Sequence, residues 1–227
     1  MKRRELLVAL AAGALAEGST GLAQASQAKF TGQIDLPKPN LKGTMSLEEA
    51  IEKRRSVRRF APKPLPVEAI GQLLWAGQGI TSSDGKRAAP AAGALYALEL
   101  YVVTATEVMH YLPDGHRAET RATHDLRPEL RALAVNQASV EAAPALLVVA
   151  ADPSRLSARY GGRANLYADL EVGHATQNML LQVVSLGLVA VTVGAVDGAP
   201  AARKLGLPHA QTVVYLVPVG FPVYVIA

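Results

Sequence analysis

Hydrophobic positions in the first third of the chain follow helical spacing in two places. Ser46 with Glu49 three residues later forms a capping box, and the apolar residues after Ser46 share one helical face, so we expect a short helix at 47–55. The same spacing returns in VEAIGQLLWAG, at 67–77. Between them, the prolines of APKPLP restrict the residues that precede them, so the two helices are separate.

The rest of the chain alternates between continuous apolar runs and helical spacing. PALLVVAAD, at 144–152, suits a central buried strand. Pro113-Asp114-Gly115 is a strong turn sequence inside an expected hairpin at 107–121. Further strands are expected at 98–106, 188–196 and 212–222.

Three more helical segments are expected, at 127–143, 166–186 and 200–207. The segment at 166–186 has few residues that must face water, which indicates a buried helix, and Gly187 ends it. Helices mixed with strands that are not adjacent in sequence predict an α+β fold.

Residues 1–25 have the layout of a secretory signal. A basic start precedes an apolar run that is too short to span a bilayer, and Ala23 and Ala25 give an A-x-A cleavage site. The Arg3-Arg4 pair is similar to a twin-arginine signal, which would export an already folded protein. The alternative is an uncleaved amphipathic arm.

This layout predicts three parts of the chain. We expect a signal at 1–25, an extended N-terminal arm at 26–44 and a single domain at 45–227. The mature protein would then be periplasmic, or cytoplasmic if the signal does not function. After the signal no apolar run of membrane length follows, so no integral membrane segment is expected.

Composition removes several classes of function. The chain has no cysteine, which excludes disulfides, zinc–thiolate sites, iron–sulfur clusters and cysteine nucleophiles. The five histidines lack metal-ligand spacing, so no metal is expected. A formal net charge of +4 with 5% aromatic residues argues against nucleic-acid binding.

Positive charge is concentrated in EKRRSVRRF, residues 52–60. Arginine is favoured for phosphate recognition because its planar guanidinium can donate to two oxygens at once. Arginines at a helix C-terminus are also favoured simply by the helix dipole, so this segment alone leaves both interpretations open. A second unusual segment is RAAPAAGALYALELYVV, residues 87–103, whose small residues would let a flat ligand approach the backbone.

These segments occur in the order found in the FMN-binding nitroreductase superfamily, which the chain resembles from about Met45 to Pro222. RRSVRRF resembles the opening phosphate motif of that family. RAAPAAGALYALELYVV resembles the R-x-x-P-S-A-G-A-L-Y-P-L-E motif of its SagB-type dehydrogenase branch, which includes azoline oxidases. HYLPDGH, EVGHATQNMLLQVVSLGL and YLVPVGFP have counterparts there in the same order.

The resemblance implies a nitroreductase-like fold, with a central mixed or antiparallel sheet flanked by helices, a long central helix, and FMN at the interface of a homodimer. The residues it implies for the FMN phosphate, ribityl chain and ring edge are Arg54, Arg55, Ser56 and Arg58. Those it implies along the ring are Ala91, Ala92 and Gly93, with Val193 and Gly194 near the flavin N5. We expect the first two groups to hold the two ends of one FMN.

The implied activity is that of an FMN-dependent oxidoreductase, which passes electrons between an organic substrate or NAD(P)H and a second acceptor. An exported protein would meet little NAD(P)H, which favours a small-molecule or peptide substrate. No catalytic acid is identified.

The alternative is a non-catalytic flavin- or peptide-binding relative with a degenerate site. Ala91 and Ala97 stand where the branch has serine and proline, and no basic residue follows Pro222. Either the arginines at 54–58 then suffice for the phosphate, or Arg163, Arg203 or Lys204 substitutes for the missing contact.

Overall fold

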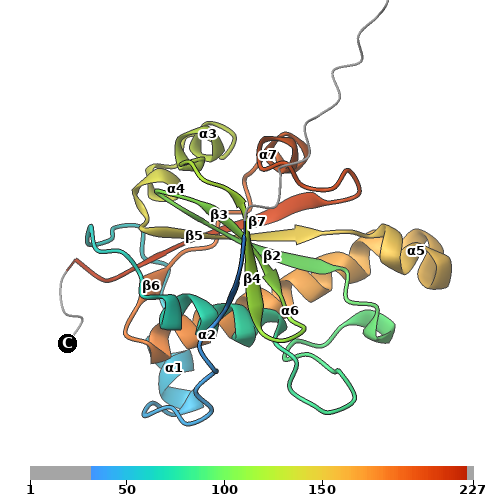
Figure 1. The fold of residues 1–227 in the computed structure, drawn as a ribbon, viewed down its shortest axis with the longest axis horizontal. Coiled ribbons are helices and arrows are strands. Elements are labelled where there is room, and N and C mark those ends of the chain that lie inside the picture. The colour runs from blue at the N-terminus through green and yellow to red at the C-terminus, as the bar shows by residue number, and fades with distance from the viewer. Residues whose placement is uncertain (1–31, 224–227) are drawn as a thin grey trace, which may run out of the picture.

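The computed structural model describes residues 32–223, which form one seven-stranded sheet with helices on both faces (Figure 1). The expected signal at 1–25 and the first residues of the expected arm lie outside the described residues. All neighbouring strands pair antiparallel, in the order β1-β4-β3-β2-β5-β7-β6. The strands are β1 Gly32–Asp35, β2 Leu98–Thr104, β3 Val108–Leu112, β4 Arg117–Ala122, β5 Ala145–Ala151, β6 Val189–Ala190 and β7 Thr212–Gly220. The predicted α+β fold is therefore confirmed.

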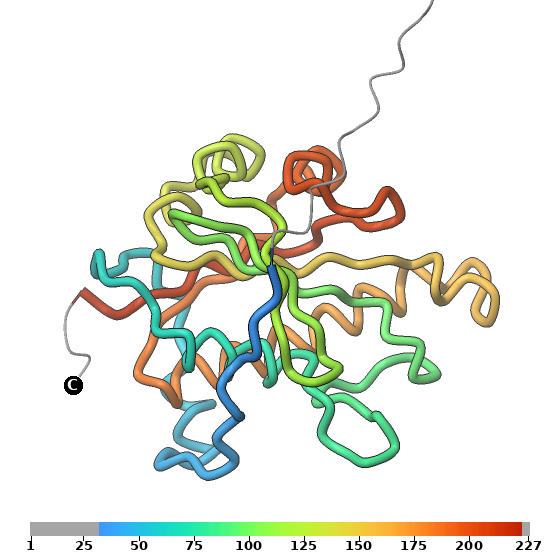
Figure 2. The backbone as a smooth tube through the Cα atoms, viewed as in Figure 1, coloured from blue at the N-terminus to red at the C-terminus, as the bar shows by residue number. Residues whose placement is uncertain are grey.

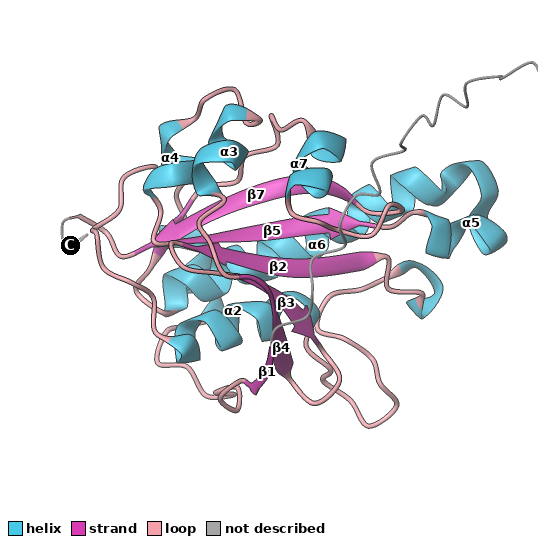
Figure 3. Cartoon of the chain, turned by 45° about the horizontal axis from the view of Figure 1, so that its top comes forward, coloured by secondary structure: helices cyan, strands magenta, loops and turns pink. Residues whose placement is uncertain are grey.

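The helices form a layer on each face of the sheet (Figure 3). The α-helices are α1 Leu47–Lys53, α2 Val67–Gln78, α3 Arg127–Ala132, α4 Ala138–Ala142, α5 Ser154–Tyr160, α6 Ala164–Ser185 and α7 Gly198–Lys204; two 3₁₀ turns are η1 Ala92–Ala94 and η2 Gly161–Arg163. Apolar residues of α2 and α6 pack on one face of the sheet, and those of α3, α4 and α7 pack on the other.

The central strand and the long helix were the clearest predictions, and both are confirmed. Every residue of β5 is buried, because its side chains alternate between the two cores. The buried stripe of α6 faces the sheet, and Gly187, at φ 68°, follows its end. The capping box at α1 is also present, since Glu49 N donates to Ser46 Oγ at 3.1 Å.

Several boundaries differ from the predictions. The single helix expected at 127–143 is two short helices, because Val135 and Asn136 adopt positive φ of 53° and 55° between them. The helix α5 was not predicted. The strand expected at 188–196 is reduced to β6 and an isolated bridge from Val193 to Leu216. Residues 32–35 of the expected arm pair with β4 as an edge strand.

Within residues 32–223 no helix has both the length and the apolarity to cross a bilayer.

The packing of α7 on β7 gives a first testable prediction. A Cβ at Gly198 would collide with the carbonyl oxygen of Val213 and lie 2.8 Å from Thr212 Cγ2. Because backbone cannot yield as a flexible side chain does, we expect Gly198→Ala to lower the free energy of unfolding by about 2 kcal/mol. Thermal denaturation measures this. Gly162→Ala is the control, since its Cβ would meet nothing within 4 Å, and an equal loss in both variants would contradict the prediction.

Candidate functional site

The segment after α1, residues 54–59, lies beside the edge strand β6; we call it the arginine segment. Val57 N donates to Ala190 O at 2.9 Å, and Ser56 forms a bridge with Ala190. Beyond it, Phe60 bridges Pro222 past the end of β7. The segment is therefore fixed by main-chain hydrogen bonds at a sheet edge, with Ser56 and Arg58 exposed.

The four arginines of this segment have no carboxylate within ion-pair distance among residues 32–223. Arg55 Nη1 donates only to main-chain oxygens, those of Glu52 and Arg54. Four arginines without carboxylate partners within six positions concentrate positive charge, which a bound anion would offset. The residues present fit the phosphate of FMN.

Val193 and Gly194 continue along the same sheet edge. Val193 exchanges main-chain hydrogen bonds with Leu216, at 2.8 and 3.1 Å, and its side chain is buried in the core on the α7 side. Gly194 is exposed. Val193 lies three positions after Ala190, a span of at most about 10 Å. The structure therefore places the arginine segment and the Val193–Gly194 pair along the same edge of the sheet.

The residues predicted to lie along the ring belong to a loop before β2, residues 90–97, which we call the 90–97 loop. Glu171 of α6 anchors it, because its two carboxylate oxygens accept hydrogen bonds from Ala92 N at 2.8 Å and from Ala97 N at 3.1 Å. Between these two points Gly93, Ala94 and Tyr96 all have positive φ. Positive φ is costly for residues other than glycine, so the carboxylate holds a strained turn.

Glu171 is 2% exposed. Burial raises its pKa above the ordinary glutamate range, while the hydrogen bonds from Ala92 and Ala97 act in the opposite direction. Sequence reasoning missed this residue. The signal was available, because Glu171 lies on the same helical face as Ala168 and Ala175, on the buried side of α6.

A second anchor comes from α5. Arg155 Nη1 donates to the carbonyl oxygen of Tyr96 at 2.9 Å, and the same guanidinium binds Glu99. Burial disfavours the ionised form of Glu99, but its hydrogen bonds with His110 and Arg155 outweigh burial and lower its pKa. The 90–97 loop is therefore fixed from two helices, through both its N–H and its C=O groups.

Within one chain the arginine segment and the 90–97 loop lie far apart. The arginine segment lies beside β6, which follows the C-terminus of α6, whereas the loop is bonded to Glu171 in the N-terminal half of α6. From Glu171 to Ser185 the helix spans about 21 Å. Figures 1 and 2 show the two segments at different ends of α6. A flavin that contacts both in one chain would have to bridge this distance.

Two cavities are associated with these elements, and neither is lined by both segments. The smaller, of about 230 Å³, lies between Ala91 and Ala92 of the loop and Tyr167, Leu170 and His174 of α6. It gives a ligand access to the small-residue face of the loop.

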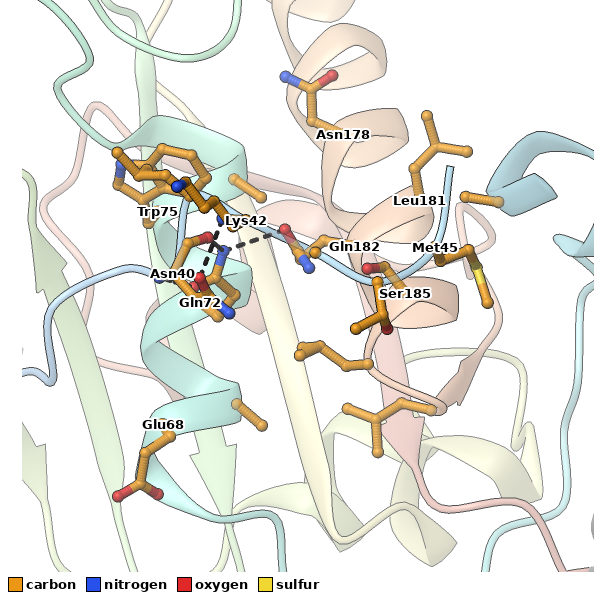
Figure 4. Close-up of a pocket in the computed structure, with 18 of the residues that line it drawn as sticks. Asn40, Lys42, Met45, Glu68, Gln72, Trp75, Asn178, Leu181, Gln182 and Ser185 are labelled. Atoms are coloured by element: carbon orange, nitrogen blue, oxygen red, sulfur yellow. Dashed lines mark hydrogen bonds between the residues drawn. The ribbon is translucent and has the colours of Figure 1, made fainter. Parts of the chain in front are cut away.

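The larger cavity, of about 900 Å³, lies between residues 37–47, α2 and the C-terminal half of α6 (Figure 4). Its central amides are already paired. Asn40 N donates to Gln72 Oε1 at 2.7 Å, and Gln72 Nε2 donates to Asn40 O and to Gln182 Oε1, both at 3.1 Å. These bonds fasten the end of the N-terminal arm to the two helices, and none of the predicted site residues lines this cavity.

The sequence model of the nitroreductase family matches residues 51–221, which include both segments and all of α6. The chain belongs to the nitroreductase family. Membership in the nitroreductase family makes the protein an oxidoreductase and supports its assignment as a flavoprotein.

Named relatives agree with this assignment. "Putative nitroreductase MJ1384" of Methanocaldococcus jannaschii is 38% identical over 157 residues, which cover 66% of this chain and 79% of the relative. The crystal structure of a "putative nitroreductase" from Ralstonia eutropha JMP134 has a TM-score of 0.77 at 25% identity. The match covers 97% of this chain and 97% of that chain. The NADPH:FMN oxidoreductase of Vibrio harveyi, solved with NAD+, has a TM-score of 0.59 at 26% identity and covers 79% of this chain and 70% of its own.

Proposed function

We propose that this nitroreductase-family protein is an FMN-dependent oxidoreductase whose flavin lies between two copies of the chain. The observation that carries the proposal is the separation of the arginine segment from the 90–97 loop along α6. Two copies related by a two-fold axis across α6 would set the arginine segment of one against the loop of the other. Each dimer would then hold two flavins.

The surface of the chain supports such an association. Leu166 and Leu170, one turn apart on α6, are 50% and 49% exposed, and Leu47 and Ile51, one turn apart on α1, are 60% and 56% exposed. Large apolar side chains exposed as pairs on helix faces are typical of surfaces that a partner covers. A copy of the chain seated on α6 would bury the first pair beside the 90–97 loop.

The roles of the residues follow from their chemistry. Arg54, Arg55 and Arg58 would bind the phosphate oxygens, with Ser56 as a further donor. The ring would rest on Ala91 and the backbone of the 90–97 loop, and exposed Gly194 would leave room beside it. FMN, when bound, supplies the electron transfer itself; the protein binds it, orients it and excludes water.

We further propose that the protein belongs to the SagB-type branch, acts on an organic substrate and is exported. The sequence of residues 87–103 supports the branch, and the layout of residues 1–25 supports export.

Absorbance of freshly purified protein tests the proposal. We expect a flavin band in the blue and a flavin-to-chain ratio near one, because each dimer has two sites. Anaerobic addition of NADPH then tests the electron donor, and slow bleaching relative to an organic donor is expected. A colourless protein that takes up no added FMN would refute the proposal and favour a degenerate, non-catalytic relative.

A further inference from the structure

The arginines of residues 32–223 fall into two groups, those with a carboxylate ion-pair partner and those without one. Five of them form ion pairs with carboxylates: Arg117, Arg121, Arg127, Arg131 and Arg155. Of the eight without such a pair, four form the arginine segment and one, Arg203, lies on α7. The remaining three, Arg87, Arg159 and Arg163, surround the 90–97 loop.

Each of these three arginines lies over the ring of a tyrosine at cation–π distance. Arg87 Cζ lies 4.3 Å from the ring centroid of Tyr96. The other two pairs are Arg159 with Tyr160 at 5.5 Å and Arg163 with Tyr167 at 5.2 Å. A guanidinium that is attracted to an aromatic ring and has no carboxylate partner can still donate its N–H groups to an anion.

The pair on α5 and the pair that joins Arg163 of η2 to Tyr167 of α6 form one continuous surface. Tyr160 and Tyr167 contact edge to face, with ring centroids 4.9 Å apart. Tyr167 lines the smaller cavity, and a Cβ at Gly93 would lie 2.7 Å from Tyr160 Oη and 2.8 Å from Arg159 Nη1. The arginine–tyrosine surface therefore borders the face of the 90–97 loop on which the flavin ring would rest. Arg87 lies deeper, where burial lowers its pKa, and its Nη1 donates to Gln78 Oε1 at 2.8 Å.

We propose that Arg159 and Arg163, on the surface formed by Tyr160 and Tyr167, bind the anionic group of a planar aromatic substrate beside the flavin. This inference rests on the proposed function for the position of the flavin, and it names the substrate class. FMN carries one phosphate, which the arginine segment accounts for, so a second group of unpaired arginines at the ring end is available for a different anion. That anion is a carboxylate of an aromatic acid or a phosphate of a dinucleotide, and both would use the same guanidinium groups.

Calorimetric titration of the purified protein with 4-nitrobenzoate and with its neutral analogue 4-nitrobenzamide tests the proposal. We expect the wild type to bind the carboxylate at least about tenfold more tightly, since hydrogen bonds to charged groups are worth that much. In Arg159→Gln/Arg163→Gln the preference should fall to within about twofold, because the amide side chains lack charge. Arg131→Gln, on α3 at the other face of the sheet from α6, should keep the wild-type preference.

Paired titrations with NADPH and NADH identify the source of the anion. A preference for NADPH that disappears in the double variant, without discrimination between the nitrobenzene probes, would support the site and assign it to a dinucleotide phosphate. Equal binding within both ligand pairs in the wild type, 4-nitrobenzoate against 4-nitrobenzamide and NADPH against NADH, would overturn the proposal. A preference that persists in the double variant would overturn it as well. The flavin-to-chain ratio of each preparation is recorded separately, so a failure to bind FMN remains distinguishable from a failure to bind the anion.

Discussion

Two variants that each fail to hold FMN should regain about a quarter of the flavin sites when they are combined, if every site is shared between two copies. The first variant, Arg54→Ala/Arg58→Ala, removes two guanidinium groups that have no carboxylate partner, and we expect at least about 100-fold weaker binding. The second, Ala91→Trp, fills the face of the 90–97 loop. Its backbone, at φ −132°, accepts any side chain.

The expected quarter follows from counting. Random assembly makes about half of the dimers mixed, and each mixed dimer has one site built from the two intact halves. Co-expression with two different affinity tags isolates the mixed species, in which absorbance should show about one flavin per dimer, half of its sites. Full flavin in the first variant would place the phosphate elsewhere. No recovery in the mixed dimer would mean that both segments serve one site within a single copy.

Replacing Glu171 should have the largest effect of any single substitution described here. In Glu171→Leu the N–H groups of Ala92 and Ala97 lose their acceptors in a buried site, so we expect the free energy of unfolding to fall by about 2–4 kcal/mol. In Glu171→Gln one N–H keeps an acceptor while the amide NH₂ group faces the other donor, so a loss of about 1–2 kcal/mol is expected. Chemical denaturation measures both. Asp169→Asn, exposed on the same helix, is the control; an equal loss there would contradict the role of Glu171.

The pH dependence of the free energy of unfolding distinguishes the effect of ionising Glu171 from the effect of its hydrogen bonds. Its pKa is raised in the folded state, so the stability linked to this group is complete below the ordinary glutamate pKa and is lost as pH rises through the folded value. Glu99 has a lowered pKa, so its contribution is lost as pH falls through its folded value. We expect Glu171→Gln to remove the first loss and keep the second. A variant with the unchanged wild-type profile would show that Glu171 does not titrate with folding.

The elements that the sequence predicted well are those with a strong apolar pattern. The continuous run of β5 and the stripe of α6 require burial, and no competing arrangement satisfies them. The break between α3 and α4 was not predicted, because neither Val135 nor Asn136 is a glycine, the residue that most often marks positive φ. The polar sequence of α5, SRLSARY, likewise gave no periodic signal.

The sequence predicted which residues form the candidate site, but it did not predict how the two segments lie relative to each other in space. Both segments were identified by composition, but their distance in space depends on the course of α6, which no local pattern encodes. Glu171 was missed because a carboxylate in a long helix is usually exposed, and only its position on the buried stripe distinguishes it. Arg155 was missed because its partner, the carbonyl oxygen of Tyr96, belongs to a loop 59 residues away in sequence.

The unbroken helix α6 also fixes the distance and the rotation between the 90–97 loop and the arginine segment. Its N-terminal half is bonded to the 90–97 loop, and its C-terminus leads into β6, which lies beside the arginine segment. Adding a single residue in its middle would shift one end by about 1.5 Å and turn it by about 100° relative to the other. Evolution can therefore vary the loops of this protein more freely than the number of residues between Glu171 and Ser185.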